Sequence, residues 1–393
     1  MAVQTTSRIS HIAADPTFDL GAYSVISEQD FSDAAAEITQ WDGYSATPLY
    51  SLAELAREVG VAAIQYKHEG SRFGLGSFKA LGGAYAAQRL LGRELSRLVG
   101  TDVSLADVRS RVWAEEAAGI KLVSATDGNH GRSLAWGCHR FGASCRIYIH
   151  ANVSSGRERA MRDLGAEIVR IDGDYDESVV RCRQDADENG WFVVSDTSWQ
   201  GYTETPRDVL AGYGVMIREV YMQASAPPTH VFVQGGVGGL AAATAAALRQ
   251  LWGAESPRVV VVEPSLAACL FESARNGRPV AVEIEVETIM AGLSCGEPSP
   301  MAWEVLKSEI SDFLVIDDNL IPPTVRRLAR PSGRDPVIEA GESGVAGLAA
   351  LIDAAGSTEM RQKLGLNAES RVLLIGSEGV TDPAIFAEIM SSH

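Results

Sequence analysis

The chain has 393 residues, a formal net charge of −17 and five cysteines. Hydrophobic residues make up 46% and charged residues 22% of it, so it can bury a substantial core instead of remaining disordered. The acidic balance argues against nonspecific attraction to nucleic acid or to an anionic membrane surface.

The sequence gives no sign of a targeting segment, a membrane span or a metal site. No basic segment followed by an apolar stretch opens the chain, and no run of about 18 apolar residues occurs. We therefore expect neither a secretory signal nor a membrane span, and a cytoplasmic location. No CxxC, HxxxH or HExxH spacing is present, which predicts no catalytic metal. Most cysteines should be buried thiols, although a bridge between Cys269 and Cys295 stays open because both lie near glycine-bearing segments.

Residues 1–50 look irregular, with a polar opening and few periodic segments. From residue 51 onward, helical and strand patterns alternate along the chain. Helices are expected at 51–60, 78–98, 131–142 and 157–165, the first ended by Gly60 and the last by Gly165. Strands are expected at 62–69, 120–126, 144–150, 166–172, 229–234, 257–264 and 371–377. This alternation predicts an α/β fold with parallel sheets.

Three glycine-bearing segments follow predicted strands, where open α/β sheets bind their ligands. The first, at residues 70–86, carries Lys79 at a predicted helix start. The positive end of a helix dipole disfavours an ammonium, and a desolvated amine there would be a good nucleophile toward an aldehyde. On position alone, a surface lysine is the more common occurrence.

The second segment is SATDGNHG, residues 124–131, where a strand turns into a helix. Its backbone N–H groups are suited to holding a carboxylate, and Asn129 adds an amide donor. Asp127 is unexpected in an anion-binding loop, because a carboxylate there raises the energy unless it has a chemical use. Taken alone, such a segment is more often an Asx turn or a helix cap than an anion site.

The third segment, residues 231–248, is a strand followed by glycines and an alanine-rich helix. It predicts a phosphate cradle, because no Cβ blocks approach and several N–H donors converge at the helix start. A second interpretation stays open: Gly236, Gly238 and Ala241 fit a dinucleotide motif, with Glu263 about twenty residues on to bind a ribose. That interpretation, a nicotinamide-dependent oxidoreductase, leaves Lys79 without a purpose.

Together the three segments resemble the fold-type-II pyridoxal-phosphate enzymes, which include serine and threonine dehydratases and the tryptophan synthase β chain. The resemblance implies that Lys79, after Phe78 in an SFK segment, bears the cofactor. It also implies that Asn129 touches the ring hydroxyl and that Ser377 faces the pyridine nitrogen. The phosphate would lie on the glycine loop, which consists of Gly235, Gly236, Val237, Gly238 and Gly239.

Within this family, residues 71–86, 125–143, 195–206, 290–306 and 339–347 resemble the diaminopropionate ammonia-lyases. The ordinary serine dehydratases have a serine where this chain has Asp127. A carboxylate there suits a cationic substrate, and it could take the α-proton. The implied activity is the elimination of ammonia from 2,3-diaminopropionate, giving pyruvate and ammonia.

The resemblance assigns further roles at the substrate. Lys79 and Asp127 would lie on opposite faces of the cofactor, so that each serves one enantiomer and both L and D substrates react. Asp196 would hold the distal ammonium, unless it is only a loop carboxylate that caps the next turn. The other residues expected at the substrate are Thr126, Gly128 and His130.

The resemblance also implies two lobes with the cofactor between them. The larger lobe would comprise residues 1–85 and 205–393, and a smaller mobile lobe residues 86–204. A homodimer is expected on the same ground. The sequence also leaves open a serine or threonine dehydratase of the same fold and a noncatalytic ligand-binding relative.

Overall fold

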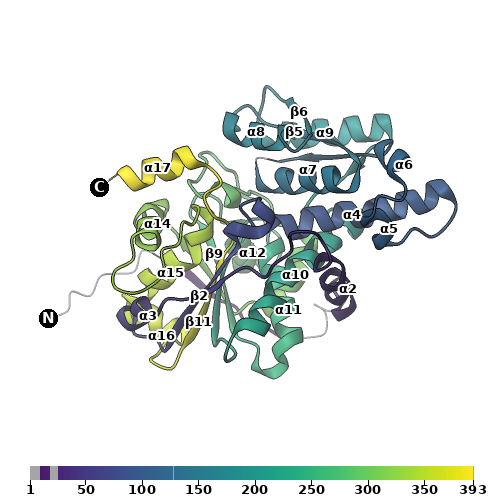
Figure 1. Ribbon diagram of the computed structural model, residues 1–393. Coiled ribbons are helices and arrows are strands. Elements are labelled where there is room, and N and C mark those ends of the chain that lie inside the picture. The colour runs from purple at the N-terminus through teal and green to yellow at the C-terminus, as the bar shows by residue number, and fades with distance from the viewer. Residues whose placement is uncertain (1–8, 18–24, 127, 393) are drawn as a thin grey trace. The chain divides into compact units, whose positions relative to one another are not determined.

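The computed structural model describes residues 9–17, 25–126 and 128–392 (Figure 1). The chain divides into two compact units, each folded around its own sheet. Unit 1 comprises residues 1–28, 46–71 and 216–393, and unit 2 comprises residues 29–45 and 72–215. The division into a larger cofactor-binding lobe of residues 1–85 and 205–393 and a smaller mobile lobe of residues 86–204 stays a prediction.

Unit 1 contains a seven-stranded sheet in the order β1-β10-β9-β8-β11-β3-β2. Its five central strands are parallel, and the two edge strands run antiparallel to their neighbours. Every residue of β8 is buried, as expected for a parallel strand covered on both faces. The strands are β1 (Ser10–Ala13), β2 (Leu49–Ser51), β3 (Ala63–His68), β8 (His230–Gln234), β9 (Arg258–Pro264), β10 (Asp312–Ile316) and β11 (Arg371–Gly376).

Helices cover both faces of the unit 1 sheet. In Figure 1, α14 and α15 lie to one side of the strands and α11 to the other. The alanines of α11 are buried throughout the helix, which allows close packing. The helices of unit 1 are α3 (Ala53–Val59), α11 (Gly239–Trp252), α12 (Cys269–Asn276), α13 (Pro300–Glu309), α14 (Ile321–Ala329), α15 (Ala346–Ala355), α16 (Thr358–Leu364) and α17 (Pro383–Ser391).

Unit 2 contains a four-stranded parallel sheet in the order β6-β5-β4-β7. Its strands are β4 (Lys121–Ala125), β5 (Ser144–Ile149), β6 (Glu167–Arg170) and β7 (Phe192–Val193). Its helices are α2 (Glu28–Ile38), α4 (Lys79–Val99), α5 (Leu105–Arg109), α6 (Ala114–Ala118), α7 (Asn129–Phe141), α8 (Ser155–Arg162) and α9 (Tyr175–Asn189), while α10 (Glu204–Gln223) continues into unit 1. Helices α4 and α7 pack closely, since a Cβ on Gly137 would lie 2.9 Å from Ala84 Cα.

The α/β fold predicted from the alternating patterns is confirmed. The prediction for residues 1–50 is wrong, because β1, α2 and β2 all lie there. Strand β1 pairs with β10, about 300 residues further along the chain, so no local pattern could have revealed it. Helix α2 buries mainly small side chains, Ala34 and Ala35 with Ile38, which gives only a weak apolar stripe.

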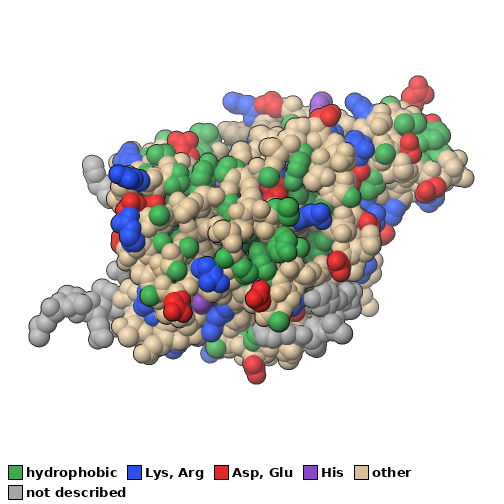
Figure 2. Space-filling model, turned by 60° about the horizontal axis from the view of Figure 1, so that its bottom comes forward, with side chains coloured by type: hydrophobic (Ala, Val, Ile, Leu, Met, Phe, Trp, Pro, Cys, Tyr) green, Lys and Arg blue, Asp and Glu red, His purple; other side chains and the backbone are tan. Residues whose placement is uncertain are grey.

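The surface carries charges of both signs. Figure 2 shows lysine and arginine side chains interspersed with acidic ones across the face in view, with hydrophobic side chains between them. The net charge of −17 is therefore not gathered into one acidic patch on that face. Among the described residues, no helix has the length and apolar character needed to cross a membrane.

A buried ion pair joins β3 to α10 within unit 1. Lys67 Nζ donates to Glu219 Oε2 at 2.7 Å, to Gln223 Oε1 at 2.9 Å and to the Thr47 carbonyl at 2.8 Å. The Lys67 side chain is fully buried and that of Glu219 is 4% exposed. All three ammonium donors are therefore used, which is what an ammonium needs when it is taken out of water.

We predict that Lys67→Met destabilises the protein by about 3–5 kcal/mol, because the buried Glu219 carboxylate loses its cation. Chemical denaturation of the full chain measures this. The matched control is Lys307→Met, whose partner Glu304 is 54% exposed, and which should change stability by less than about 1 kcal/mol. Equal effects of the two substitutions would contradict the prediction.

Candidate cofactor and catalytic site

The residues predicted for the site fall in both units. Unit 2 contains Phe78, Lys79, Thr126, Gly128, Asn129, His130 and Asp196. Unit 1 contains Gly235, Gly236, Val237, Gly238, Gly239 and Ser377. Asp127 lies outside the described residues.

Lys79 is the first residue of α4, as its position in the sequence predicted. Its Nζ forms an ion pair and hydrogen bond with Asp196 Oδ2, and the two side chains are 20% and 18% exposed. The rings of Phe78 and Tyr213 flank the ammonium, with centroids 5.4 and 5.9 Å from Nζ. An amine at this point is shielded by aromatic carbon on one side and paired with a carboxylate on another.

Opposing effects set the charge of Asp196. Burial raises the pKa of Asp196, but the Lys79 ammonium, the His130 ring and the hydrogen bond from Lys79 lower it by more. The net result is a pKa well below the usual range for an aspartate, so the carboxylate is ionised at any physiological pH. This charge depends on a cation remaining close by.

His130 supports the same carboxylate from α7. Its Nε2 lies 2.9 Å from the Val194 carbonyl oxygen, which only accepts hydrogen bonds, so Nε2 carries a proton. Its buried Nδ1 faces Asp196 Oδ2 at 3.9 Å and has no hydrogen-bond partner in the part of the chain that the structure describes. The orientation of the ring is therefore set by the backbone beside Asp196.

Tyr202 holds the segment that carries Asp196. Its hydroxyl accepts from the Ser195 N–H at 3.0 Å and donates to the Val193 carbonyl at 2.9 Å. Its ring stacks on Trp199 at a centroid distance of 3.8 Å. Sequence reasoning did not single out Tyr202, although it lies in one of the family-like segments, because a turn of this kind is visible only in three dimensions.

The loop of residues 124–131 connects β4 to α7. The Gly128 N–H donates to Thr126 Oγ1 at 3.3 Å, and the Thr126 N–H donates to the Tyr148 carbonyl at 3.0 Å. Asn129 begins α7, and the N-cap residue of this helix is Gly128, which has no side chain to cap it. The N-terminal N–H groups of a 13-residue helix therefore lie beside the asparagine amide, which suits an oxygen-bearing ligand.

In unit 1 the glycine loop joins β8 to the start of α11. Gly236 and Gly238 have φ angles of +63° and +97°, a region that favours glycine. A Cβ on Gly235 would lie 2.6 Å from Glu263 Cγ, and one on Gly238 would lie 2.9 Å from Leu306 Cδ1. The N-cap residue of α11 is Gly238, which has no side chain to cap the helix, so its first N–H groups are presented by a loop whose backbone favours glycine.

Ser377 lies at the same edge of the unit 1 sheet as the glycine loop. It follows β11, which is parallel and adjacent to β8, and its residue is 4% exposed. Gln234, the last residue of β8, ties the two strand ends together, since its Nε2 donates to the Ile375 carbonyl at 2.6 Å. The parallel register therefore brings the predicted phosphate loop and the predicted pyridine partner side by side.

These residues fit pyridoxal phosphate. The loop offers a phosphate a glycine cradle at a helix start whose N-cap residue is a glycine, and Ser377 follows the neighbouring strand. Lys79 offers a shielded amine beside a carboxylate that accepts a proton or a cation. The donor set thus contains a group for the phosphate, the ring nitrogen and the aldehyde of that cofactor.

The dinucleotide interpretation is wrong, because Glu263 is not available to a ribose. Its residue is fully buried, and both oxygens accept from the start of α12, Oε1 from the Leu270 N–H at 2.9 Å and Oε2 from the Phe271 N–H at 2.7 Å. Burial raises the pKa of Glu263 to about 8, and the two N–H donors oppose that rise. Glu263 is a helix cap beneath Gly235.

The cysteines are free thiols, and all but Cys295 are buried. This confirms the expectation for most of them and shows that the bridge left open between Cys269 and Cys295 is not formed. Cys269 Sγ instead approaches the Gly236 carbonyl oxygen at 3.6 Å, and burial raises its pKa well above the usual range for a thiol. It packs under the glycine loop as a small apolar group.

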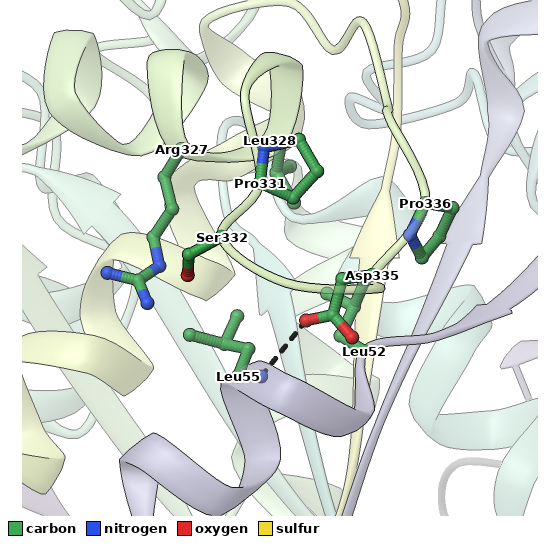
Figure 3. Close-up of a pocket in the computed structure, with 8 residues that line it drawn as sticks. All are labelled: Leu52, Leu55, Arg327, Leu328, Pro331, Ser332, Asp335 and Pro336. Carbon is green, nitrogen blue, oxygen red and sulfur yellow. Dashed lines mark hydrogen bonds between the residues drawn. The ribbon is translucent and has the colours of Figure 1, made fainter.

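Two hollows in unit 1 differ in what they can hold. The crevice in Figure 3 has a volume of about 10 Å³, room for a single water, and its Asp335 accepts from the Leu55 N–H as a cap of α3. None of its lining residues belongs to the predicted site. The other hollow, of about 460 Å³, includes His68 at the end of β3 and Gly379, two residues beyond Ser377, and is large enough for a small molecule.

We predict that Glu263→Ala lowers stability by about 1–3 kcal/mol, because two buried N–H groups of α12 lose their acceptor. The folded state also holds a proton on Glu263 between about pH 4.5 and 8 that the unfolded state has released, so this group makes stability fall as pH rises through that range. Urea denaturation across this range should show a shallower fall in the variant. The exposed Glu255→Ala serves as control, and a steeper fall in Glu263→Ala than in this control would contradict the assignment.

Comparison with known proteins agrees with this geometry. Residues 40–378 match the family model described as pyridoxal-phosphate dependent enzyme. The diaminopropionate ammonia-lyase of Escherichia coli (strain K12) is 36% identical over 384 residues, covering 96% of this chain and 95% of that protein. The enzyme of the same name from Salmonella typhimurium is 36% identical over 357 residues, covering 88% of each.

Solved structures extend the agreement to the fold. The crystal structure of the Escherichia coli diaminopropionate ammonia-lyase with a reaction intermediate superposes with a TM-score of 0.88 at 34% identity, covering 98% of this chain and 97% of that one. The predicted type-II fold is thereby confirmed. The chain belongs to the pyridoxal-phosphate-dependent enzyme family, in the fold-type-II group that includes the diaminopropionate ammonia-lyases.

Proposed function

We propose that this protein eliminates ammonia from 2,3-diaminopropionate to give aminoacrylate, which water then hydrolyses to pyruvate and a second ammonia. The observation that carries the proposal is the ion pair between Asp196 and the primary ammonium of Lys79. When Lys79 is committed to the cofactor, Asp196 loses that cation while remaining largely buried. A substrate with a second ammonium can replace it, whereas serine and threonine cannot.

Lys79 is the proposed attachment point of pyridoxal phosphate and the base for one enantiomer. Bound cofactor supplies an electron sink for the carbanion that forms when the α-proton leaves. Asp196 keeps the lysine side chain directed and its amine charged until the cofactor arrives. His130 adds a second polar group next to Asp196 and limits the movement of that carboxylate.

Asp127 is the proposed base on the opposite face. This role rests on the resemblance of its loop to the ammonia-lyases and on its place before Gly128 and Asn129 at the start of α7. Two bases on opposite faces would let both L and D substrates react. Thr126, Gly128 and the N–H groups that begin α7 would bind the substrate carboxylate.

The remaining roles follow from the edge of the unit 1 sheet. Gly235 to Gly239 would hold the phosphate, Asn129 the ring hydroxyl and Ser377 the pyridine nitrogen. A neutral hydroxyl leaves the ring less electron-withdrawing than a carboxylate would, which suits an elimination with a short-lived carbanion. Closure of a mobile lobe of residues 86–204 on the larger lobe would exclude water. A homodimer in the cytoplasm is proposed on the same resemblance.

We predict that the purified holoprotein releases pyruvate from diaminopropionate far faster than from serine or threonine, because only diaminopropionate offers Asp196 a second ammonium. A coupled pyruvate assay on L- and D-diaminopropionate, L-serine, D-serine and L-threonine measures this. Lys79→Ala is the inactive control and should also lose the visible absorbance of bound cofactor.

Two outcomes would move the assignment. Faster release from serine or threonine would make the protein a dehydratase of the same fold. Pyruvate release from none of these amino acids by a protein that binds the cofactor would favour a noncatalytic relative.

We predict that Asp127→Asn lowers the rate with D-diaminopropionate by roughly 100-fold or more and that with L-diaminopropionate much less, because the amide cannot accept the α-proton. Steady-state kinetics on the two enantiomers give the comparison. Glu342→Gln, a buried carboxylate with no role in the proposal, controls for loss of charge alone. Equal losses for both enantiomers would contradict two bases on opposite faces.

A further inference from the structure

Tyr213 is a buried phenol next to Lys79 that the proposed function does not use. It lies on α10, its residue is 1% exposed, and its ring packs on Phe78 at a centroid distance of 4.6 Å. Lys79 Nζ lies 5.9 Å from the centroid of the Tyr213 ring. All three residues belong to unit 2.

Close contact between α4 and α10 holds the Tyr213 ring in place. A Cβ on Gly82 would lie 2.4 Å from Tyr213 Cε1, and a Cβ on Gly212 would lie 2.3 Å from the Leu81 carbonyl oxygen. Both glycines are therefore needed for the helices to approach this closely. The ring is directed at the first turn of α4, where Lys79 lies, and has little freedom to turn away.

The hydroxyl of Tyr213 is buried and makes no hydrogen bond of ordinary geometry to a described residue, although the Lys79 side chain is near enough to act on it as a hydrogen-bond partner. Buried hydroxyl groups almost always have a partner, since leaving one unsatisfied raises the energy of the folded state. Burial raises the pKa of Tyr213 well above the usual range for a tyrosine, and Asp196 adds to that rise, whereas the charge of the Lys79 ammonium and a side-chain hydrogen bond from it oppose the rise. The phenol therefore stays neutral and keeps one donor and its acceptor capacity available.

We propose that Tyr213 is a positioning residue for Lys79, whose Oη accepts a hydrogen bond from the Lys79 amine when that amine leaves Asp196. The four-carbon lysine stem allows Nζ to move between the two partners while α4 stays fixed. Asp196 then holds the amine in one position and Tyr213 in a second. This inference rests on the proposed role of Lys79.

The movement has a use in an elimination. Once the substrate is bound, Asp196 takes the substrate ammonium, and the Tyr213 phenol then helps to keep Lys79 directed at the reacting carbon. A neutral phenol provides one without adding a charge that would compete for the substrate. The residue would therefore affect turnover more than substrate binding.

The first test uses the cofactor-free full chain and does not depend on turnover. Acetic anhydride labels unprotonated lysines, and peptide mass spectrometry follows the labelling of Lys79 as pH rises. Asp196 pairs directly with Lys79, and His130 faces Asp196, so these groups also affect the protonation of the amine. Tyr213→Phe is therefore compared in two backgrounds, the native protein and Asp196→Asn, and the second lacks the competing carboxylate. Without Asp196, loss of the phenol should lower the labelling midpoint of Lys79 by roughly 0.5–1 pH unit, and with Asp196 by less.

The second test uses the holoenzyme. Tyr213→Phe should lower kcat with diaminopropionate by roughly threefold to tenfold and leave KM within about twofold. Tyr85→Phe, a buried tyrosine on the same helix α4 as Lys79, is the matched control and should match the native protein in both tests. Tyr213→Met replaces Tyr213→Phe if the latter does not fold.

An unchanged labelling midpoint in the Asp196→Asn background would overturn the inference, as would equal effects of Tyr213→Phe and Tyr85→Phe. An effect confined to KM would assign Tyr213 to substrate binding and overturn it too. The labelling result is independent of which amino acid reacts. Failure of this inference is therefore distinguishable from failure of the proposed reaction.

Discussion

The Asp196 carboxylate needs a cation beside it, both before and after the cofactor and substrate bind. In the structure that cation is the ammonium of Lys79. The carboxylate is mostly shielded from water, so its ionised form is stable only while a positive group is near. Lys79 forms this ion pair, and His130 Nδ1 lies 3.9 Å from Asp196 Oδ2. The same physical requirement that fixes the lysine side chain is what would select a substrate with two amines.

Keeping Asp196 in place requires structure well beyond the ion pair itself. Tyr202 bonds the backbone on both sides of Val194, and the Val194 carbonyl orients His130. The segment from β7 to α10 therefore presents one carboxylate against a braced backbone. Preorganisation of this kind matters because a charged group that could swing toward water would lose its preference for a cationic ligand.

Unit 1 contributes uncharged groups to the predicted site, namely the backbone N–H groups of the glycine loop and the hydroxyl of Ser377. Glu263, the carboxylate directly under the glycine loop, is occupied by the N-terminus of α12. The loop can therefore offer its own N–H groups to a phosphate without Glu263 competing as an anion at its surface. Parallel pairing of β8 and β11 then places Ser377 beside that loop.

The sequence alone determined the α/β class, the three glycine-bearing segments and part of the elements after residue 51, because these follow from local periodicity and turn chemistry. Strands β3, β4, β5, β6, β8, β9 and β11 and helices α3, α4, α7, α8 and α11 were predicted, whereas β7, β10 and the remaining helices were not. It also placed Lys79 at a helix start and favoured the family resemblance over the dinucleotide motif, which leaves Lys79 without a purpose. Only the tertiary structure showed that Glu263 is not available to a ribose, since the motif spacing of Gly236, Gly238 and Glu263 is the same whichever way the Glu263 side chain points. Other features were visible only in the tertiary structure. Distant parts of the chain meet in the ion pair of Lys79 with Asp196, in the contact of Tyr213 with Lys79 and in the pairing of β1 with β10. The turn that Tyr202 holds has no local sequence signature, so it too could not be predicted from the sequence pattern.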